Sequence, residues 1–388
     1  MDISKIIDFL QSEYNKDFYQ ILQRKKNISI NELQKLIQNN PENPIKDILS
    51  QIKIQHKNKR KISNVQKYLF TEKGAQQASS TTLAHYHAEK FRRFNSIADL
   101  CCGVGMDLIQ IAVGKEKVFA VDLDEETLLA AEFNSNQAGL RNIRFLQQKA
   151  EDFNISVDAI FSDPDRRPGK ERKIQKEDIQ PSLDALLELK KNTPNLAVKL
   201  SPAMNYKNLN IAGEHTFEFV SENGTLKEIL LCLGDLATPN VRRKAIILPQ
   251  NIQLVNQNIQ IEIKEIEQYI FEPDPAIIRA GLVQECGAEI GYHLIDSKLA
   301  ILSGVNAINS ELGKCFKMKQ VIPFNLKKLQ QYCRENLIGE LVIKTRGFPD
   351  TVEDFRKKLK LKGANKEILF IIRKGDNHLM IFAEKEES

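Results

Sequence analysis

A chain of 388 residues, of which 42% are hydrophobic, is long enough to bury two or three cores, which excludes a disordered or fibrous protein. No run approaches the ~20 continuous apolar residues that a membrane span requires, and the first residues lack the layout of a signal peptide. The net charge is only +5, so where the basic residues lie matters more than how many there are. We expect a globular protein with no membrane segment.

The cysteines and histidines predict neither disulfides nor a metal site. Among the six cysteines, Cys101 and Cys102 are adjacent, and no Cys-x-x-Cys pair occurs. His85 and His87 are two residues apart, a spacing that points the two rings to different faces of a helix. We therefore expect a reduced, cytoplasmic protein without bound metal.

Residues 1–92 are predicted to form an N-terminal helical region. Apolar residues recur with helical spacing from Ile3 to Leu10 and from Ile45 to Ile52, and Ser29 with Glu32 forms a capping box. These apolar stripes are expected to face the core.

A polar stretch follows, at residues 76–82, ahead of a helix predicted over residues 83–94. It either caps that helix or forms a lid over a cofactor cleft.

The most informative stretch joins a strand, a glycine turn and a helix. The apolar run 97–100 leads into Cys101-Cys102-Gly103-Val104-Gly105 and then into a helix predicted over residues 106–113. A second strand, 118–121, ends in Asp122 about 20 residues after the glycines, followed by an acidic helix, 125–138. This layout is typical of a nucleotide-binding βαβ unit, in which the acidic residue binds ribose hydroxyls.

Further strands complete a predicted α/β sheet of seven strands. Two of them cover residues 143–147 and 158–162, and the second leads directly into Asp163-Pro164-Asp165-Arg166-Arg167. A fifth strand is predicted at 196–200, and an antiparallel hairpin at 216–221 and 228–232 closes the sheet. Ligands bind at the carboxyl ends of strands in such sheets.

The C-terminal third predicts smaller α+β modules. Residues 252–263 alternate polar and apolar as an edge strand or hairpin does, and Asp274 with Pro275 begins a helix. The last fifty residues predict a βαββ arrangement, with Asp350 and Glu353 capping its helix. The basic residues Arg356, Lys357 and Lys360 are expected on the exposed side of that helix, a face that suits a phosphate backbone.

Basic residues are dense in three places, namely 53–61, 166–173 and 356–362. Charge runs are usually solvated faces, but one of these three directly follows the Asp163-Pro164 corner. The distribution favours a polyanionic partner.

Together these motifs resemble the bacterial class I S-adenosylmethionine (SAM) dependent methyltransferases that end in a THUMP-like domain. The resemblance covers residues 76 to the C-terminus, in motifs that begin at Asp99, Asp163, Lys199, Phe271, Lys344 and Arg356. It implies four parts: a helical region at 1–92, a Rossmann-like methyltransferase core at 93–248, a ferredoxin-like α+β module at 249–335 and a THUMP-like RNA-binding domain at 336–388.

The resemblance also implies site residues. Asp99, Cys101, Gly103 and Gly105 would hold the methionine end of SAM, Asp122 the ribose, and Glu151 the adenine. Catalysis is assigned to Asp163 and the Pro164 carbonyl. Substrate binding is assigned to basic residues along the chain: Arg166, Arg167, Arg346, Arg356, Lys357 and Lys360.

The Asp163-Pro164-Asp165-Arg166 loop leaves two reactions open. Methyltransferases that act on exocyclic base amines carry Asp/Asn-Pro-Pro-aromatic, and this chain keeps only the Asp-Pro. The loop also resembles Asp-Pro-Pro-Arg of enzymes that methylate C5 of uridine, which need a cysteine nucleophile. Ser201 and Pro202 stand where that cysteine would be, so we rank methylation of a base nitrogen above C5 methylation.

We expect a methyltransferase that acts on tRNA or rRNA. The alternatives are an RNA-binding or ribosome-assembly protein with a vestigial SAM pocket, and a methyltransferase for a small molecule or a protein. Salt dependence of binding separates RNA from the last of these, since phosphate contacts weaken steeply with ionic strength. The oligomeric state does not follow from the sequence.

Overall fold

The computed structural model describes residues 1–25, 29–166, 178–348, 351–359 and 361–386. The chain divides into two compact units. The first comprises Met1–Thr216 with Ile229–Asn240, and the second comprises Phe217–Glu228 with Val241–Ser388. None of the helices in the described ranges combines the length and the apolar character that crossing a bilayer demands.

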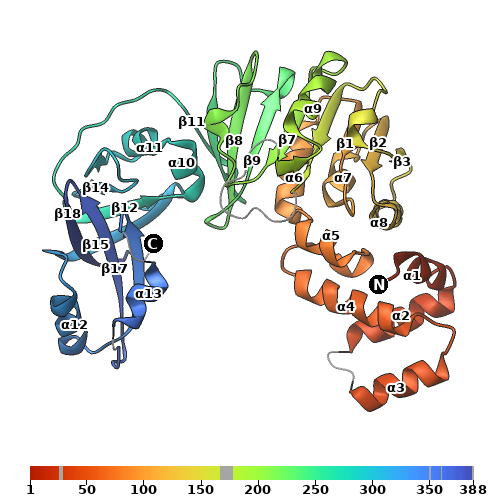
Figure 1. The fold of residues 1–388 in the computed structure, drawn as a ribbon, viewed down its shortest axis with the longest axis horizontal. Helices are drawn as coiled ribbons and strands as arrows, with labels where there is room; N and C mark the ends of the chain where they lie inside the picture. Colours follow the sequence, from red (N-terminus) through yellow and green to blue (C-terminus); the bar gives the residue numbers. More distant parts are fainter. Residues whose placement is uncertain (26–28, 167–177, 349–350, 360, 387–388) are drawn as a thin grey trace. The chain divides into compact units, whose positions relative to one another are not determined.

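The helices are short and are spread over both units (Figure 1). Their bounds are α1 Ile3–Phe9, α2 Glu13–Arg24, α3 Ile30–Asn39, α4 Ile45–Asn58, α5 Glu72–Gln77, α6 Thr81–Lys90, α7 Met106–Ile111, α8 Glu125–Gln137, α9 Leu183–Glu188, α10 Pro275–Ala280, α11 Val283–Ile290, α12 Leu326–Glu335 and α13 Val352–Lys357.

The strands of the first unit are β1 Ser96–Leu100, β2 Lys117–Asp122, β3 Ile143–Gln147, β4 Ala159–Ser162, β5 Asp165–Arg166, β6 Ile179–Gln180, β7 Leu196–Leu200 and the end of β9 Thr225–Leu233. The others are β8 His215–Glu222, β10 Arg243–Leu248, β11 Ile252–Val255, β12 Tyr269–Pro273, β13 His293–Leu294, β14 Leu302–Gly304, β15 Gly313–Pro323, β16 Ile338–Arg346, β17 Asn365–Lys374 and β18 Asn377–Lys385.

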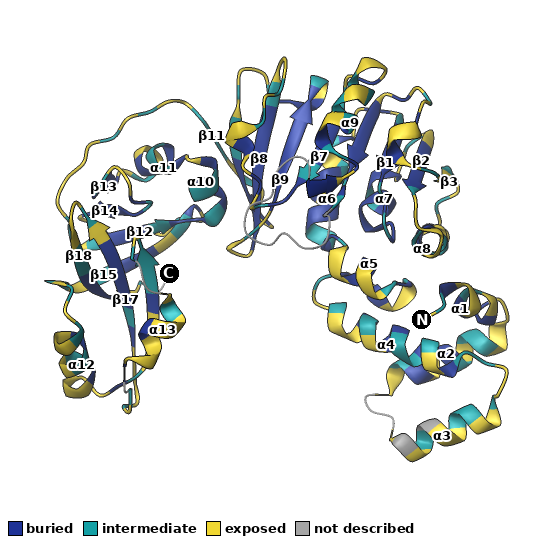
Figure 2. Ribbon diagram, in the orientation of Figure 1, coloured by how far each residue is buried: buried dark blue, intermediate teal, exposed yellow. Residues whose placement is uncertain are grey.

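In the first unit the strands follow the order β9-β7-β4-β1-β2-β3. All neighbours in this sheet run parallel except β9, which is antiparallel to β7. The central strands β1, β4 and β7 are almost completely buried, as parallel strands covered on both faces should be (Figure 2). The predicted Rossmann-like α/β fold is confirmed.

Two strands were missing from the predicted seven-stranded sheet. In the second unit β10 pairs in parallel with β8, and β11 pairs antiparallel with β10. The alternating pattern of residues 252–263 predicted a longer strand than the structure has, because β11 ends at Val255. Ile263, at the far end of that pattern, forms only an isolated bridge with Leu294.

The second unit also contains a separate sheet with the order β13-β14-β12-β15-β18-β17-β16. The predicted βαββ arrangement is present as β16, α13, β17 and β18. The boundary that we predicted between residues 335 and 336 falls between α12 and β16, and strands from both sides of it belong to this sheet. The division of the chain into four domains stays a prediction.

Several helix ends differ from their predicted positions by a few residues. Helix α7 ends at Ile111 rather than at residue 113, and α6 runs from Thr81 to Lys90 rather than from 83 to 94. The N-cap of α13 is Thr351, whose hydroxyl accepts from the Asp354 N–H; the predicted cap, Asp350, lies outside the described residues. Two overlapping pairs have the spacing of a capping box, namely Asp350 with Glu353 and Thr351 with Asp354, which explains why the predicted N-cap differs by one residue.

The N-terminal helices pack directly on the α/β core of the first unit. Their apolar cluster includes Val104 and Met106, which lie in and after the glycine turn. The fully buried Asn134 on α8 joins the two parts: its amide donates to the Leu69 and Val104 carbonyls, both at 2.9 Å, and its oxygen accepts from the Leu69 N–H at 2.7 Å. The glycine turn is therefore held by α8 through Asn134 and by the N-terminal helices through their apolar contacts with Val104.

Candidate functional site

The carboxyl ends of β1, β2 and β4 meet at one edge of the sheet. The Asp163 N–H, just after β4, donates to the Leu100 carbonyl at 3.3 Å, and the Cys101 N–H donates to the Val121 carbonyl at 2.8 Å. The three acidic residues predicted at these strand ends are Asp99, Asp122 and Asp163, and the structure brings them together at this edge.

The turn after β1 depends on left-handed backbone conformations. Cys101, Gly103 and Gly105 have φ angles of +67°, +55° and +85°. A Cβ added at Gly105 would lie 3.3 Å from Ala131 of α8, so a side chain there would be both strained and crowded. A Cβ added at Gly103 would meet nothing within 4 Å, so the turn leaves open space on that side.

Asp122 fixes this turn from the end of β2. One of its carboxylate oxygens accepts from the Gly103 N–H at 2.9 Å and the other from the Asp124 N–H at 3.0 Å. Burial raises the pKa of Asp122, and these two backbone hydrogen bonds act against that rise. A carboxylate oxygen can accept more than one bond, so both oxygens keep capacity for ligand hydroxyls.

Asp99 is a buried acid whose carboxylate has no hydrogen-bond partner among the described residues. Its side chain is 1% exposed, and neither oxygen makes a hydrogen bond to any described residue. Burial, and then the nearby carboxylates of Asp107 and Asp163, raise its pKa well above the usual value. A buried charge in this condition destabilises the protein unless a cationic group comes to pair with it.

Asp163 is held by a lysine. The Lys199 ammonium, on β7, donates to Asp163 Oδ2 at 2.6 Å and to the Ser79 hydroxyl at 3.2 Å. The Lys199 side chain is only 15% exposed, so this ion pair is well shielded from water. The pairing orients one oxygen of Asp163 toward β7.

The network continues into the core through Asp107 of α7. Its carboxylate accepts from the Ser79 hydroxyl and contacts His87 Nδ1 of α6, both at 2.7 Å. Burial opposes ionisation of Asp107, but His87, Lys199 and Ser79 together lower its pKa to about 2. His87 is completely buried and packs against the ring of Phe161 at 5.0 Å. Asp107 therefore anchors Ser79.

Helix α5 lies beside the same strand ends. Lys73 forms an ion pair with Asp165, and Gln77 donates to the other oxygen of Asp165 at 2.6 Å. The helix packs tightly on the glycine turn, since a Cβ added at Gly74 would come within 2.4 Å of Val104. Ser80, within the polar stretch 76–82, is the N-cap of α6, and Gln77 and Ser79 of the same stretch contact residues of the site.

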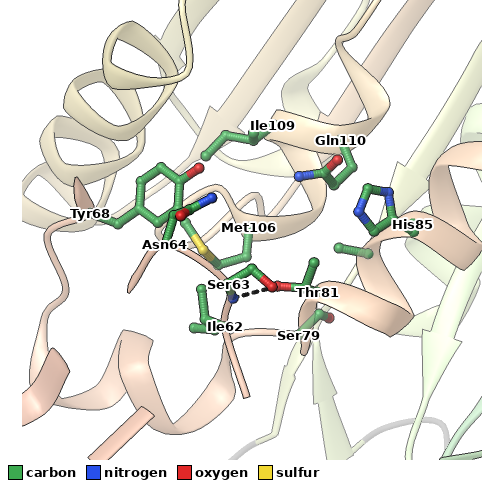
Figure 3. A pocket seen from close by; sticks show the side chains of 11 residues that line it. Ile62, Ser63, Asn64, Tyr68, Ser79, Thr81, His85, Met106, Ile109 and Gln110 are labelled. Atoms are coloured by element: carbon green, nitrogen blue, oxygen red, sulfur yellow. Dashed lines mark hydrogen bonds between the residues drawn. The ribbon is translucent and has the colours of Figure 1, made fainter. Parts of the chain in front are cut away.

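A pocket of about 130 Å³ lies between residues 62–68 and helices α6 and α7 (Figure 3). Tyr68, Met106 and Gln110 line it, and the Ser63 N–H donates to the Thr81 hydroxyl at 2.8 Å on its floor. The lining contains no carboxylate, lysine or arginine. The charged groups at the strand ends, rather than this pocket, define the candidate site.

Other predicted residues of the first unit lie around the strand ends or outside the described ranges. Glu151 is exposed on a 3-10 turn, Ala150–Asp152, after β3. Pro164 is buried directly after Asp163, and Arg166 lies on β5, which pairs with β6. Arg167 and Lys360 lie outside the described residues. Their predicted roles stay predictions.

The predicted substrate-binding residues of the second unit have partners within that unit. Arg346 and Lys344 both pair with Glu272 of β12, and the Arg346 contact is 2.7 Å long. The Lys344 ammonium also lies 5.4 Å from the Phe316 ring centre. On α13, Arg356 donates to the Leu341 carbonyl at 3.2 Å, and Lys357 pairs with Asp354 at 3.0 Å.

Our reasoning from the sequence assigned no role to four residues of the network: Ser79, His87, Asp107 and Lys199. Lys199 and Asp107 were visible as parts of the motifs that carried the resemblance, but their contacts depend on the tertiary fold. Ser79 and His87 come from the helical region before the core. The sequence marked the stretch around Ser79 only as a cap or lid, and it considered His87 only in a metal pair with His85 that its spacing argued against.

Two family models match parts of this chain. A methyltransferase domain model matches residues 95–206, and a THUMP domain-like model matches residues 313–385. The described residues contain no group of three or more His, Cys, Asp or Glu side chains placed to hold a metal ion.

The chain is also similar along most of its length to known proteins. Two uncharacterised S-adenosylmethionine-dependent methyltransferases of Mycobacterium tuberculosis, from strains CDC 1551 and H37Rv, are each 26% identical over 321 residues, which is 81% of this chain and 87% of theirs. The crystal structure of a candidate methyltransferase from Porphyromonas gingivalis W83 superposes with a TM-score of 0.73 at 19% identity, covering 95% of this chain and 94% of that one, and so shares its fold. The chain is a class I SAM-dependent methyltransferase with a THUMP-like domain at its C-terminal end.

Proposed function

We propose that this methyltransferase transfers the methyl group of SAM to a nitrogen atom of a base in tRNA or rRNA. The observation that carries the proposal is the Asp163–Lys199 pair, which stands at the same strand ends as the unpartnered carboxylate of Asp99. One acidic group is free to hold a cationic cofactor, and the other is oriented as a hydrogen-bond acceptor.

The residues at the strand ends fit SAM. The buried, unpartnered Asp99 suits the cationic amino group of its methionine end, and the open side of Gly103 leaves room for that end. Asp122 has acceptor capacity for the ribose hydroxyls, and Glu151 is proposed to contact the adenine. When bound, SAM supplies an activated methyl group on a sulfonium.

Asp163 is proposed to orient the acceptor nitrogen. Its carboxylate accepts a hydrogen bond from the N–H of the base, together with the Pro164 carbonyl. Lys199 balances the charge of Asp163 and holds one of its oxygens in place. Because the methyl group is already activated, most of the rate enhancement comes from this positioning.

A base nitrogen is favoured over C5 of a pyrimidine because of the cysteines. C5 methylation needs a thiolate that attacks C6 of the base. The cysteines at these strand ends are Cys101 and Cys102, and burial, followed by the charge of nearby aspartates, raises the pKa of both thiols well above the usual value. The backbone of Cys101 also forms part of the turn itself. These features support direct transfer without a covalent intermediate.

RNA is proposed as the substrate because of the THUMP-like domain and its charge. Residues 313–385 contain 17 basic and 8 acidic residues, a net charge of +9. Such an excess suits a polyanion, and phosphate contacts position a nucleic acid before its bases are recognised. A small-molecule or protein substrate would leave this domain unexplained.

The test is mass spectrometry of nucleosides from tRNA and rRNA of cells with and without the gene. We expect one methylated nucleoside to be missing without the gene and to return with the wild-type gene. Cells that carry Asp163→Ala should lack it, because we expect transfer to slow by at least about 100-fold.

The control variant is Glu188→Gln, which removes an exposed carboxylate that pairs with Lys191 on the surface. It should restore the nucleoside fully. An unchanged set of methylated nucleosides after deletion of the gene would contradict the proposal, and full restoration by Asp163→Ala would contradict the role of Asp163.

A further inference from the structure

Helix α4 carries a stripe of basic residues on one face. Lys46, Lys53 and Lys57 fall within about 40° of one another on a helix of 3.6 residues per turn, and Arg60 continues the line just after the helix. All four are exposed. The opposite face, with Ile45, Ile48 and Ile52 among its residues, is buried. The stripe is thus the solvent side of a firmly seated helix.

The charges of this stripe are not balanced by acidic neighbours. Residues 45–70 contain seven basic residues and one acidic residue, a net charge of +6. That acid, Asp47, contacts the chain's N-terminus. Within the described part of the chain, the four stripe residues make no ion pair with any carboxylate. Since residues 45–70 and 313–385 together carry +15, the rest of this +5 chain carries −10.

The partners of α4 show that the stripe is fixed relative to the candidate site within the first unit. Gln51 accepts from the Phe70 N–H at 3.1 Å, and Gln55 donates to the Tyr68 carbonyl at 2.8 Å. Lys61, just beyond the stripe, donates to the Ala75 and Gln76 carbonyls of α5. Because α5 packs on the glycine turn, the stripe and the turn belong to one packed body.

We infer that the α4 stripe, defined as Lys46, Lys53, Lys57 and Arg60, binds the phosphate backbone of the RNA substrate. Lys46 and Lys57 are about 16 Å apart along the helix axis at 1.5 Å per residue, which is long enough to meet several successive phosphates. The inference rests on the proposed action on RNA and adds a contact surface in the unit that holds the reaction site.

An anionic membrane is a less suitable partner for the same charges. A membrane-binding helix presents apolar residues beside its basic ones, so that they enter the lipid. The apolar residues of α4 are turned into the protein core, and the stripe itself is entirely basic. Charge without an apolar edge suits a phosphate chain in water.

The experiment measures binding of bulk tRNA by the full-length chain at several salt concentrations. The test variant is Lys53→Gln, Lys57→Gln and Arg60→Gln together. The control variant is Lys5→Gln, Lys16→Gln and Lys191→Gln together, which removes three lysines of the same unit that pair with carboxylates three residues away. Both variants lose the same total charge.

We expect the test variant to bind tRNA on the order of 100-fold more weakly at 0.1 M salt, with the slope of log K against log salt reduced by about 2. The control should bind as the wild type does. Calorimetric SAM binding should be unchanged in both variants, which shows that they are folded.

An unchanged slope in the test variant, or an equal loss in the control, overturns the inference while leaving the proposed reaction intact. The wild type could instead fail to methylate RNA and still bind tRNA in a way that depends on the stripe. That outcome would overturn the proposed reaction and not this inference. Binding of the wild type to phosphatidylglycerol vesicles but not to tRNA would overturn the inference in favour of a membrane.

Discussion

The strand ends of the first unit and the Glu272 cluster of the second unit use charge in opposite ways. Around Asp99 several carboxylates gather, and Asp99 itself has no partner among the described residues. Around Glu272 the cations Lys344 and Arg346 both pair with one carboxylate, and Lys344 also lies over the Phe316 ring. One group of charges lacks a counterion, and the other has its own.

This difference separates a site from a structural contact. Both clusters come from motifs that carried the resemblance, and the sequence predicted a ligand role for residues in each. An unpaired buried charge lowers stability unless a ligand compensates it, whereas a paired one joins two strands. We therefore expect substitutions in the first cluster to affect ligands, and substitutions in the second to affect folding.

The largest effect should come from Lys199→Met, which removes the cation that holds Asp163. We expect the methylation rate to fall about 100-fold while the affinity for SAM changes little, because the acceptor loses its orientation. Single-turnover assays with total tRNA would measure the rate, and calorimetry the affinity. Lys199→Arg should recover part of the rate. An equal loss in both quantities would mean that Lys199 supports the cofactor instead.

Next in size is Asp99→Asn, which removes the unpartnered carboxylate. We expect SAM to bind about 10- to 100-fold more weakly, since a charged hydrogen bond to the amino group is lost. The ligand-free protein should unfold at a higher temperature, because the buried charge is gone. Thermal scans with and without SAM measure both effects. A ligand-free variant less stable than the wild type would show that Asp99 has a structural partner.

The pH dependence of SAM binding sharpens the same point. Because the pKa of Asp99 is raised, the ligand-free protein takes up a proton there at a pH well above the usual carboxylate range. Affinity for the cationic cofactor should therefore fall as the pH is lowered through that raised pKa. The stability contribution of Asp99 in the ligand-free protein has the opposite sign and improves as the pH falls through that raised pKa toward the ordinary pKa of an aspartate, 3.8. In Asp99→Asn both dependences should be much weaker.

The smallest effect on ligands should come from Glu272→Gln in the second cluster. We expect the free energy of unfolding to fall by about 2 kcal/mol, because Lys344 and Arg346 lose their shared partner. SAM binding should not change. Urea titration measures the first quantity, and Glu340→Gln, whose exposed carboxylate pairs with Lys366, is the control with an expected loss below about 0.5 kcal/mol. Reduced SAM affinity would contradict the separation of roles.

Features that are local in the sequence were predictable, and those that depend on tertiary contacts were not. The glycine turn, Asp122 and the Asp163-Pro164 corner each lie at the end of a readable apolar strand, so their meeting at one sheet edge follows from parallel topology. The pairing of Asp163 with Lys199 depends on the spatial neighbours β4 and β7, and Ser79 reaches Lys199 from another region.

The charge of a side chain could also be predicted from the sequence, but whether that side chain is free to bind a ligand could not. Arg346, Arg356 and Lys357 were predicted to bind phosphate because they are basic, and each has a partner within its own unit. The partners come from other strands or from the preceding turn of the helix, and only the fold brings them close. By contrast, Lys53, Lys57 and Arg60 of the α4 stripe have no acidic residue three or four positions away that would neutralise them.

The amide of Asn134 limits how far this enzyme can be shortened. A fragment that begins at residue 93 would retain every motif of the methyltransferase core, yet it would strip Asn134 of the Leu69 backbone groups that it bonds. The same cut would uncover the apolar side of Met106 and leave a buried amide only half satisfied. The smallest autonomous catalyst within this chain therefore starts well upstream of its first sheet strand.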